Sequence, residues 1–308
     1  MDEIIRLEGL TKVYKKTPVV DSFNISIKKG HIYGLIGPNG AGKTTIMKMM
    51  AGLVEPTEGT IELFGSKENI QRSRSRMSFM IEAPYLDGSM TARENMELIR
   101  YTRGVADKNR IEEILEFVGL DKEDKKKAKK FSLGMKQRLG LGMALLSSPE
   151  IMILDEPING LDPQGIVEIR HLLRKLCDES GVTILISSHI LSELAELCDD
   201  FAIIDKGKLI EDLSKEELKQ KCMNYLSVST DDNNRLTTVL EQNLGIKGYK
   251  VFPDDEVRIY EGIENIVRIS KGITDSGLVL TRLAQEGESL EEFYLSRVSA
   301  DEDAKGVR

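Results

Sequence analysis

Residues 37 to 45 of this chain read Gly37-Pro38-Asn39-Gly40-Ala41-Gly42-Lys43-Thr44-Thr45. An apolar run at residues 32–36 precedes this glycine-rich stretch, and a helix-forming run at residues 46–50 follows it. The pattern G-x-x-x-x-G-K-[ST] between a strand and a helix is typical of a loop whose backbone N–H groups surround nucleotide phosphates. Lys43 adds a positive charge for the β- and γ-phosphates, and the Thr44 hydroxyl is a candidate ligand for Mg²⁺. The whole stretch is therefore predicted to bind a nucleoside triphosphate.

The composition is that of an ordinary globular protein. The chain has 308 residues, of which 40% are hydrophobic and 31% are charged, and its formal net charge is -8. This length suggests about two domains, and the acidic charge argues against direct binding to nucleic acid, which needs a basic surface. No apolar run reaches the roughly 20 residues that span a bilayer, and the first residues lack a signal-peptide pattern. We therefore expect a cytoplasmic protein with no membrane-spanning segment of its own.

Hydrophobic periodicity divides the chain into two parts. Up to residue 213, short β-rich runs alternate with helical spacing, which indicates α/β architecture around a parallel sheet. After a charged linker helix expected at residues 214–221, the order βαββαβ suits a small α+β ferredoxin-like domain over residues 222–300. A last helix is expected to begin at Ser289, and residues 301–308 are expected to form a flexible tail.

The expected elements follow from the spacing of apolar residues and from glycine or proline at the breaks. In the first part, strands are expected at residues 4–7, 19–20, 23–27, 32–36, 59–65, 77–81, 151–154, 182–186, 201–204 and 208–210. Helices are expected at residues 45–53, at two or three places within 92–117, and at 132–146, 163–177 and 191–198. In the second part, strands are expected at residues 225–228, 249–252, 256–260 and 277–283, with helices at 235–244 and 263–271.

Two carboxylates, Asp155 and Glu156, follow the apolar run at residues 151–154. A parallel strand of an α/β sheet would emerge here beside the phosphate loop. In that place Asp155 is a candidate to hold Mg²⁺ through water, and Glu156 is a candidate to polarise the water that attacks the γ-phosphate. A solvated acidic turn is the alternative, and it is common for an isolated Asp-Glu pair. The preceding apolar strand and the phosphate loop favour the catalytic interpretation.

A helix start at residues 131–138 resembles the signature of the ATP-binding-cassette (ABC) family. The stretch reads Phe131-Ser132-Leu133-Gly134-Met135-Lys136-Gln137-Arg138, whereas the family's usual form is Leu-Ser-Gly-Gly-Gln. Leu133 and Met135 depart from this form, while Ser132 and Gly134 are kept, and in the family these two face the γ-phosphate across a dimer interface. The resemblance covers residues 1–213 and implies a P-loop NTPase of ABC type. Such a domain has a β-subdomain, a RecA-like parallel-sheet core and a helical subdomain, here at about residues 84–145.

The resemblance also implies roles for four residues outside these motifs. Asp162, in Gly160-Leu161-Asp162, resembles the family's D-loop residue, and His189 resembles its switch histidine, which touches the γ-phosphate. Tyr14 stands where the family stacks an aromatic ring on adenine. Glu82 stands where the family usually places a glutamine that ligates Mg²⁺ and senses the membrane partner. A second acid there could tighten the ion or compete as a base, and both options stay open.

The implied function is that of an ATP-hydrolysing exporter subunit. Two copies would close head to tail on two ATP and Mg²⁺ and would drive separate transmembrane permease subunits at the inner face of the cell membrane. Glu82 and the altered signature resemble the ATPases of bacitracin-resistance and lantibiotic-immunity exporters. This similarity points to export of a peptide antibiotic or a lipid-related substrate. The second part of the chain is expected to have a structural or dimer-supporting role, with a regulatory site as the alternative.

One alternative comes from another functional class, an ABC-type ATPase that works on nucleic acid or on ribosomes. The segment between the phosphate loop and the signature leaves no room for a long coiled coil, and the chain has one Walker A motif and an acidic charge. These features weigh against that alternative. A GTPase or small-molecule kinase would need an Asn-Lys-x-Asp motif or an arginine lid, and the sequence has neither.

Overall fold

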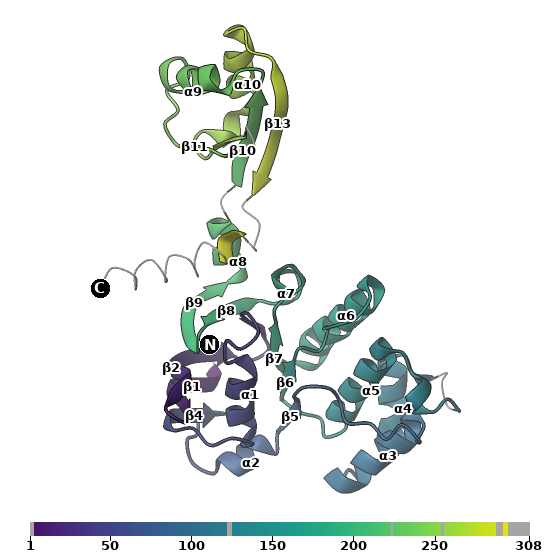
Figure 1. Cartoon of the computed structure of the whole chain (residues 1–308). Helices are drawn as coiled ribbons and strands as arrows, with labels where there is room; N and C mark the ends of the chain where they lie inside the picture. Colours follow the sequence, from purple (N-terminus) through teal and green to yellow (C-terminus); the bar gives the residue numbers. More distant parts are fainter. Residues whose placement is uncertain (1–2, 122–124, 223, 254–255, 288–291, 295–308) are drawn as a thin grey trace. The chain divides into compact units, whose positions relative to one another are not determined.

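The computed structural model describes residues 3–121, 125–222, 224–253, 256–287 and 292–294. The chain divides into two units, Met1–Lys215 and Glu216–Arg308 (Figure 1). The tail expected at residues 301–308 and the start of the helix expected from Ser289 lie outside the described residues.

A six-stranded sheet forms the centre of the first unit, in the order β5-β6-β7-β3-β8-β9. Its strands are β5 (Met77–Met80), β6 (Ile151–Asp155), β7 (Thr183–Ser188), β3 (Ile32–Ile36), β8 (Asp200–Asp205) and β9 (Lys208–Ser214). All neighbours run parallel except β8 and β9, which are antiparallel. Every residue of β3, β6, β7 and β8 is buried. Burial of both faces explains why each of these strands contains an apolar run without alternation.

A second, antiparallel sheet in the order β2-β1-β4 shares a hydrophobic core with α1 (Lys43–Ala51). Its strands are β1 (Glu3–Tyr14), β2 (Thr17–Lys28) and β4 (Glu58–Leu63). The prediction of two separate strands at residues 19–20 and 23–27 is wrong, because β2 is one continuous strand. Asp21-Ser22 reads as a turn in the sequence, and Ser22 does have a φ of 51°. Strand β2 nevertheless pairs with β1 on both sides of Ser22, and the register shift between the two paired segments is a β-bulge.

Three helices gather beside the β5 edge of the central sheet (Figure 1). They are α3 (Ala92–Arg103), α4 (Asn109–Phe117) and α5 (Leu133–Leu145). Helix α3 begins with a capping box, in which the Thr91 hydroxyl accepts from the Glu94 N–H and the Glu94 carboxylate accepts from the Thr91 N–H. The other α-helices among the described residues of this unit are α2 (Ile70–Arg74), α6 (Pro163–Ser180) and α7 (Leu191–Leu197). Helix α2 was not predicted, since its 5 residues are too few to show a helical period.

In its described residues, the second unit contains a four-stranded antiparallel sheet and two ten-residue helices that pack on it. Its strands are β10 (Asn224–Thr230), β11 (Tyr249–Val251), β12 (Val257–Ile259) and β13 (Leu280–Gly287), and its helices are α9 (Asn233–Gln242) and α10 (Ile266–Asp275). Helix α8 (Lys215–Lys221) leads into it. The observed order is the predicted βαββαβ, but the last strand was predicted three residues too early. Gly277, with φ of 77°, belongs to the turn that ends α10.

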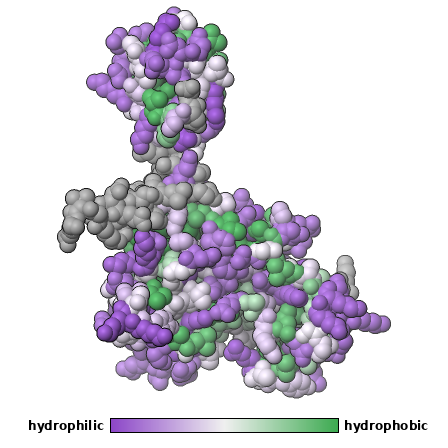
Figure 2. All heavy atoms as spheres, viewed as in Figure 1, coloured by the Kyte–Doolittle hydropathy of each residue, from purple (hydrophilic) through white to green (hydrophobic). Residues whose placement is uncertain are grey.

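Hydrophilic residues cover much of the visible surface, and hydrophobic residues occur there in small patches (Figure 2). Among the helices that the structure describes, none has the length and the apolar composition that crossing a bilayer requires.

Candidate nucleotide site

The phosphate loop connects the end of β3 to the start of α1, as its motif requires. A Cβ atom on Gly37 would lie 2.4 Å from the carbonyl oxygen of Ile204, so only glycine fits there. Gly42 has a φ of 105°, which L side chains rarely adopt. The loop lines a pocket of about 160 Å³ together with Val19 and Glu156. These glycines therefore allow the loop backbone to lie close to its neighbours while it encloses a pocket.

Lys43 points into the phosphate loop. Its side chain is only 5% exposed, and its Nζ donates to the carbonyl oxygens of Gly37 at 2.6 Å and Pro38 at 3.3 Å. The same Nζ lies 3.4 Å from Oε1 of Glu156. A buried ammonium group needs polar or anionic partners. The loop carbonyl oxygens and Glu156 supply them, and they hold the Lys43 charge inside the phosphate loop.

Thr44 and Asp155 bring two hard oxygen donors together. The Thr44 hydroxyl donates to Oδ2 of Asp155 at 2.7 Å, and the Asp155 side chain is almost fully buried. Hydroxyl and carboxylate oxygens are the ligands that Mg²⁺ prefers. The donor set at this place therefore fits the ion that the sequence predicts.

Ser187 is a residue that the sequence analysis missed. Its buried hydroxyl donates to Oδ1 of Asp155 at 2.6 Å and accepts from the Glu156 N–H at 2.9 Å. It can do both because β6 and β7 are parallel neighbours in which Asp155 pairs with Ser187. A polar pair, Ser187-Ser188, at the end of an apolar strand was the signal that could have identified it. Ser187 thus holds the carboxylate of Asp155 and the backbone of Glu156.

Ser187→Ala should therefore affect stability as well as catalysis. The variant leaves the buried Asp155 carboxylate with one partner fewer, so we expect the free energy of unfolding of the first unit to fall by about 1–3 kcal/mol. Misplacement of Asp155 and Glu156 should also lower kcat for ATP hydrolysis by about tenfold. Urea unfolding and a steady-state ATPase assay measure the two effects, with Ser180→Ala at the end of α6 as the control. Equal stability and turnover of the two variants would contradict the role given to Ser187.

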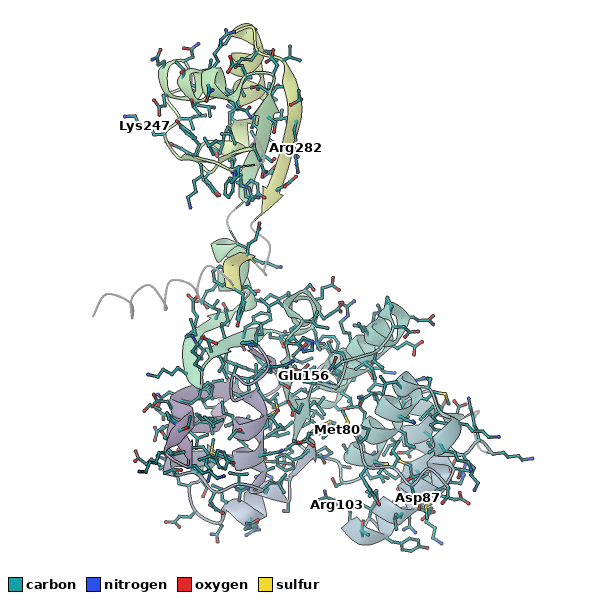
Figure 3. The ribbon with its side chains drawn as sticks, viewed as in Figure 1. Met80, Asp87, Arg103, Glu156, Lys247 and Arg282 are labelled. Atoms are coloured by element: carbon teal, nitrogen blue, oxygen red, sulfur yellow. The ribbon has the colours of Figure 1, made fainter. Side chains whose placement is uncertain are left out.

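Glu156 lies between two partners from different segments. His189, in the loop after β7, has its Nδ1 at 2.9 Å from Oε2 of Glu156. The other oxygen, Oε1, is buried and faces Lys43. Figure 3 shows Glu156 near the middle of the first unit. The fold thus brings together Glu156, His189 and the phosphate loop, which are far apart along the chain.

Glu82 pairs with Lys48, a residue that the sequence analysis did not single out. Its Oε1 accepts a hydrogen bond from Nζ of Lys48 at 2.7 Å, and no contact to Thr44 or Asp155 is present among the described residues. This hydrogen bond lowers the pKa of the Glu82 carboxyl below its ordinary value and raises the pKa of Lys48. Glu82 is therefore an ionised carboxylate held by α1.

The signature residues and the D-loop line a second pocket of about 430 Å³, which includes Ser132, Gly134 and Asp162. Ser132 caps α5 by accepting from the Met135 N–H at 3.2 Å, and Asp162 caps α6 by accepting from the Gly165 N–H at 3.0 Å. This pocket has no lining residue in common with the phosphate-loop pocket. Within one chain, the two groups of predicted nucleotide contacts thus line different pockets.

Tyr14 is the last residue of β1, and 44% of its surface is exposed. Nζ of Lys12 lies 5.1 Å from the centroid of its ring. The ring is not part of the lining of the phosphate-loop pocket. Tyr14 is therefore a half-exposed side chain outside the phosphate-loop pocket.

Known proteins resemble this chain over nearly all of its length. A family model described as ABC transporter matches residues 20–159. The bacitracin transport ATP-binding protein BcrA of Bacillus licheniformis is 42% identical over 300 residues, which cover 97% of this chain and 98% of BcrA. The chain belongs to the ATP-binding proteins of ABC transporters. This ABC ATPase binds and hydrolyses ATP, and the predicted P-loop fold of ABC type is confirmed.

Two further comparisons agree with this assignment. The lantibiotic transport ATP-binding protein SrtF of Streptococcus pyogenes is 45% identical over 213 residues, which cover 69% of this ABC ATPase and 91% of SrtF. The ATP-binding cassette MJ0796 was solved as a dimer in a post-hydrolysis state, bound to ADP and Pi. Its structure matches this chain with a TM-score of 0.62 and 26% sequence identity. The match covers 69% of this chain and 99% of the MJ0796 chain. BcrA and SrtF are transport proteins by name, and these comparisons give no support to a role in nucleic-acid or ribosome-linked work.

Proposed function

We propose that this ABC ATPase is the ATP-hydrolysing subunit of an exporter that removes a peptide antibiotic or a lipid-related substrate. The observation that carries this proposal is the 42% identity to BcrA over 97% of the chain, because this match includes the second unit as well as the nucleotide site. In this proposal, residues 1–213 are the ATP-binding domain with its helical subdomain at about 84–145, residues 214–221 are a linker helix, and residues 222–300 are an accessory domain with a structural or dimer-supporting role.

The nucleotide site supports a direct assignment of roles. The phosphate loop and Lys43 bind the β- and γ-phosphates, and Thr44 and Asp155 would hold Mg²⁺. The ion, when bound, supplies charge neutralisation on the phosphate oxygens. Glu156 accepts a proton from the attacking water, and His189 keeps the Glu156 carboxylate in place through the 2.9 Å contact.

A second copy of the chain is proposed to complete the site. Ser132 and Gly134 line a pocket that is separate from the phosphate loop, so they would contact the triphosphate that another copy binds. The structure of MJ0796 was solved as a dimer, which is consistent with this arrangement. Asp162 lies in the same pocket as the signature, and Tyr14 would stack on adenine. The result is a head-to-tail dimer around two ATP and Mg²⁺.

A groove beside β5 suits the contact with a permease. It has a volume of about 300 Å³, and Met80, Tyr85, Ile99 and Arg103 are among the residues that line it. Figure 3 labels Met80 and Arg103. Tyr85 is 91% exposed, which is unusual for a large aromatic side chain. Its lining also includes Ile81 and Ala83, the neighbours of Glu82, and the family resemblance implies that the residue at position 82 senses the membrane partner. We propose that separate transmembrane permease subunits dock here, which would place this ABC ATPase at the inner face of the cell membrane.

Affinity purification and a resistance assay test the proposed function together. We expect the tagged chain, isolated in mild detergent, to bring down a polytopic permease, and we expect deletion of its gene to lower the inhibitory concentration of bacitracin or a lantibiotic severalfold. Complementation with the parent gene should restore resistance, whereas a Glu156→Gln gene should not. Recovery of ribosomes or DNA in place of a permease, with unchanged resistance, would refute the exporter assignment.

A further inference from the structure

Strand β13 is an edge of the sheet in the second unit. In the order β11-β12-β10-β13 it pairs with β10 on one side, and no other strand among the described residues lies beside it (Figure 1). It has 8 residues, whereas β11, at the other edge, has 3. Backbone N–H and C=O groups on the outer side of an edge strand can pair with the edge of another chain. β13 is therefore the longer edge at which a further strand could add.

The two faces of β13 carry different side chains. Leu283 packs against the hydrophobic core of the second unit. Because side chains alternate along a strand, Arg282, Ala284 and Glu286 lie together on the opposite face. Arg282 donates to Oε1 of Glu286 at 2.6 Å, and these two side chains are 52% and 34% exposed (Figure 3). One positive and one negative side chain thus stand at equal distances along the strand on either side of Ala284.

This spacing is self-complementary under a two-fold axis. When two copies of β13 pair antiparallel with Ala284 opposite Ala284, residue 282 of each copy lies opposite residue 286 of the other. An arginine then meets a glutamate on both sides of the axis. Pairing centred on Arg282 or on Glu286 would instead place like charges opposite each other, which is destabilising. The charges of this edge therefore fit a second copy of the same edge in one register.

We infer that the second units of two copies of this chain pair through their β13 edges, with Ala284 at the axis. The inference rests on the proposed function in one respect, because this pairing would support the proposed ATP dimer. An interface between two short strands is small beside those of stable complexes, so the pairing is weak between free chains. Two copies that ATP holds together bring the edges to a high local concentration, and the pairing then adds to the stability of the dimer.

The test is crosslinking of the full chain with a short bismaleimide. ATP and Mg²⁺ are present, and Glu156→Gln keeps the ATP uncleaved. Cys222→Ser removes the one cysteine that is not buried, and Ala284→Cys then places a thiol at the proposed axis. Val267→Cys is the matched control, because Val267 lies on α10 of the same unit and is 78% exposed. We expect Ala284→Cys to give about tenfold more crosslinked dimer than Val267→Cys.

Charge reversal separates pairing between chains from the ion pair within one strand. Arg282→Glu leaves two acidic residues on the strand, and Glu286→Arg leaves two basic ones. Each of these variants, combined with Ala284→Cys, should crosslink about tenfold less than the chain with both native charges, because like charges then face each other. An equal mixture of the two variants should restore crosslinking as heterodimers, although the ion pair within each strand stays broken.

Size-exclusion chromatography of the same samples without crosslinker reports the ATP dimer independently. Absence of the Ala284→Cys crosslink in chains that form ATP dimers would overturn the inference and leave the proposed function intact. Crosslinking that charge reversal leaves unchanged, or that mixing does not restore, would overturn it as well. A crosslink without an ATP dimer would instead reject the proposed head-to-tail dimer, and the absence of both would reject both proposals.

Discussion

Glu156→Gln is expected to lower kcat for ATP hydrolysis by about 100-fold or more while ATP still binds. The amide has nearly the same size as the carboxylate and keeps a contact with His189, but it cannot accept a proton from water. The phosphate loop, Lys43 and Thr44 are unchanged in this variant. Nucleotide should therefore enter the site and remain there uncleaved.

The expected product of this block is an ATP-bound dimer. Size-exclusion chromatography with ATP and Mg²⁺ should show dimers of the Glu156→Gln variant and mainly monomers of the parent under turnover. Glu179→Gln on α6 is the control, since Glu179 is an exposed glutamate that contacts Lys175. Unchanged turnover in Glu156→Gln would show that another group is the base.

Lys43→Met should abolish function at an earlier step, the binding of ATP. The Lys43 ammonium is 5% exposed and is held by the carbonyl oxygens of Gly37 and Pro38. Loss of its charge-assisted hydrogen bonds to the phosphates should cost about 3 kcal/mol of binding free energy, which corresponds to about 100-fold in Kd.

Equilibrium titration with a fluorescent ATP analogue measures this change. Lys175→Met is the matched control, because Lys175 is an exposed lysine on α6. Together with Glu156→Gln, this variant separates binding from chemistry: one should lose affinity and the other should lose turnover. Wild-type affinity in Lys43→Met would mean that the phosphates bind elsewhere.

Local sequence patterns predicted most of the central sheet correctly. Strand β3 was predicted at its observed bounds, and β6 and β7 were predicted to within two residues, because a buried parallel strand is a short apolar run between polar or glycine-rich breaks. The errors occurred where pairing overrides local preference. Strand β2 continues through Ser22 because β1 pairs with both sides of the bulge.

In the nucleotide site too, residues of short local motifs could be predicted, whereas residues whose role depends on strand pairing could not. Lys43, Thr44, Asp155 and Glu156 were identifiable because each belongs to a short motif at the end of a strand. Ser187 was not, since its role depends on β7 pairing with β6, and Ser187 lies 32 residues from Asp155 in the chain. Glu82 was identified as unusual, but its partner Lys48 was not.

The sequence alone determined the phosphate loop, the acidic strand end and the βαββαβ order of the second unit. Glycine positions and apolar periods are local requirements of the backbone, and they can be recognised without knowledge of the partners. Only the tertiary structure decided that Ser187 joins Asp155 to Glu156, that Lys48 holds Glu82, and that Ser132 lines a pocket apart from Lys43. These arrangements depend on distances between segments that are remote in the chain, and the packing of helices on the sheet sets those distances.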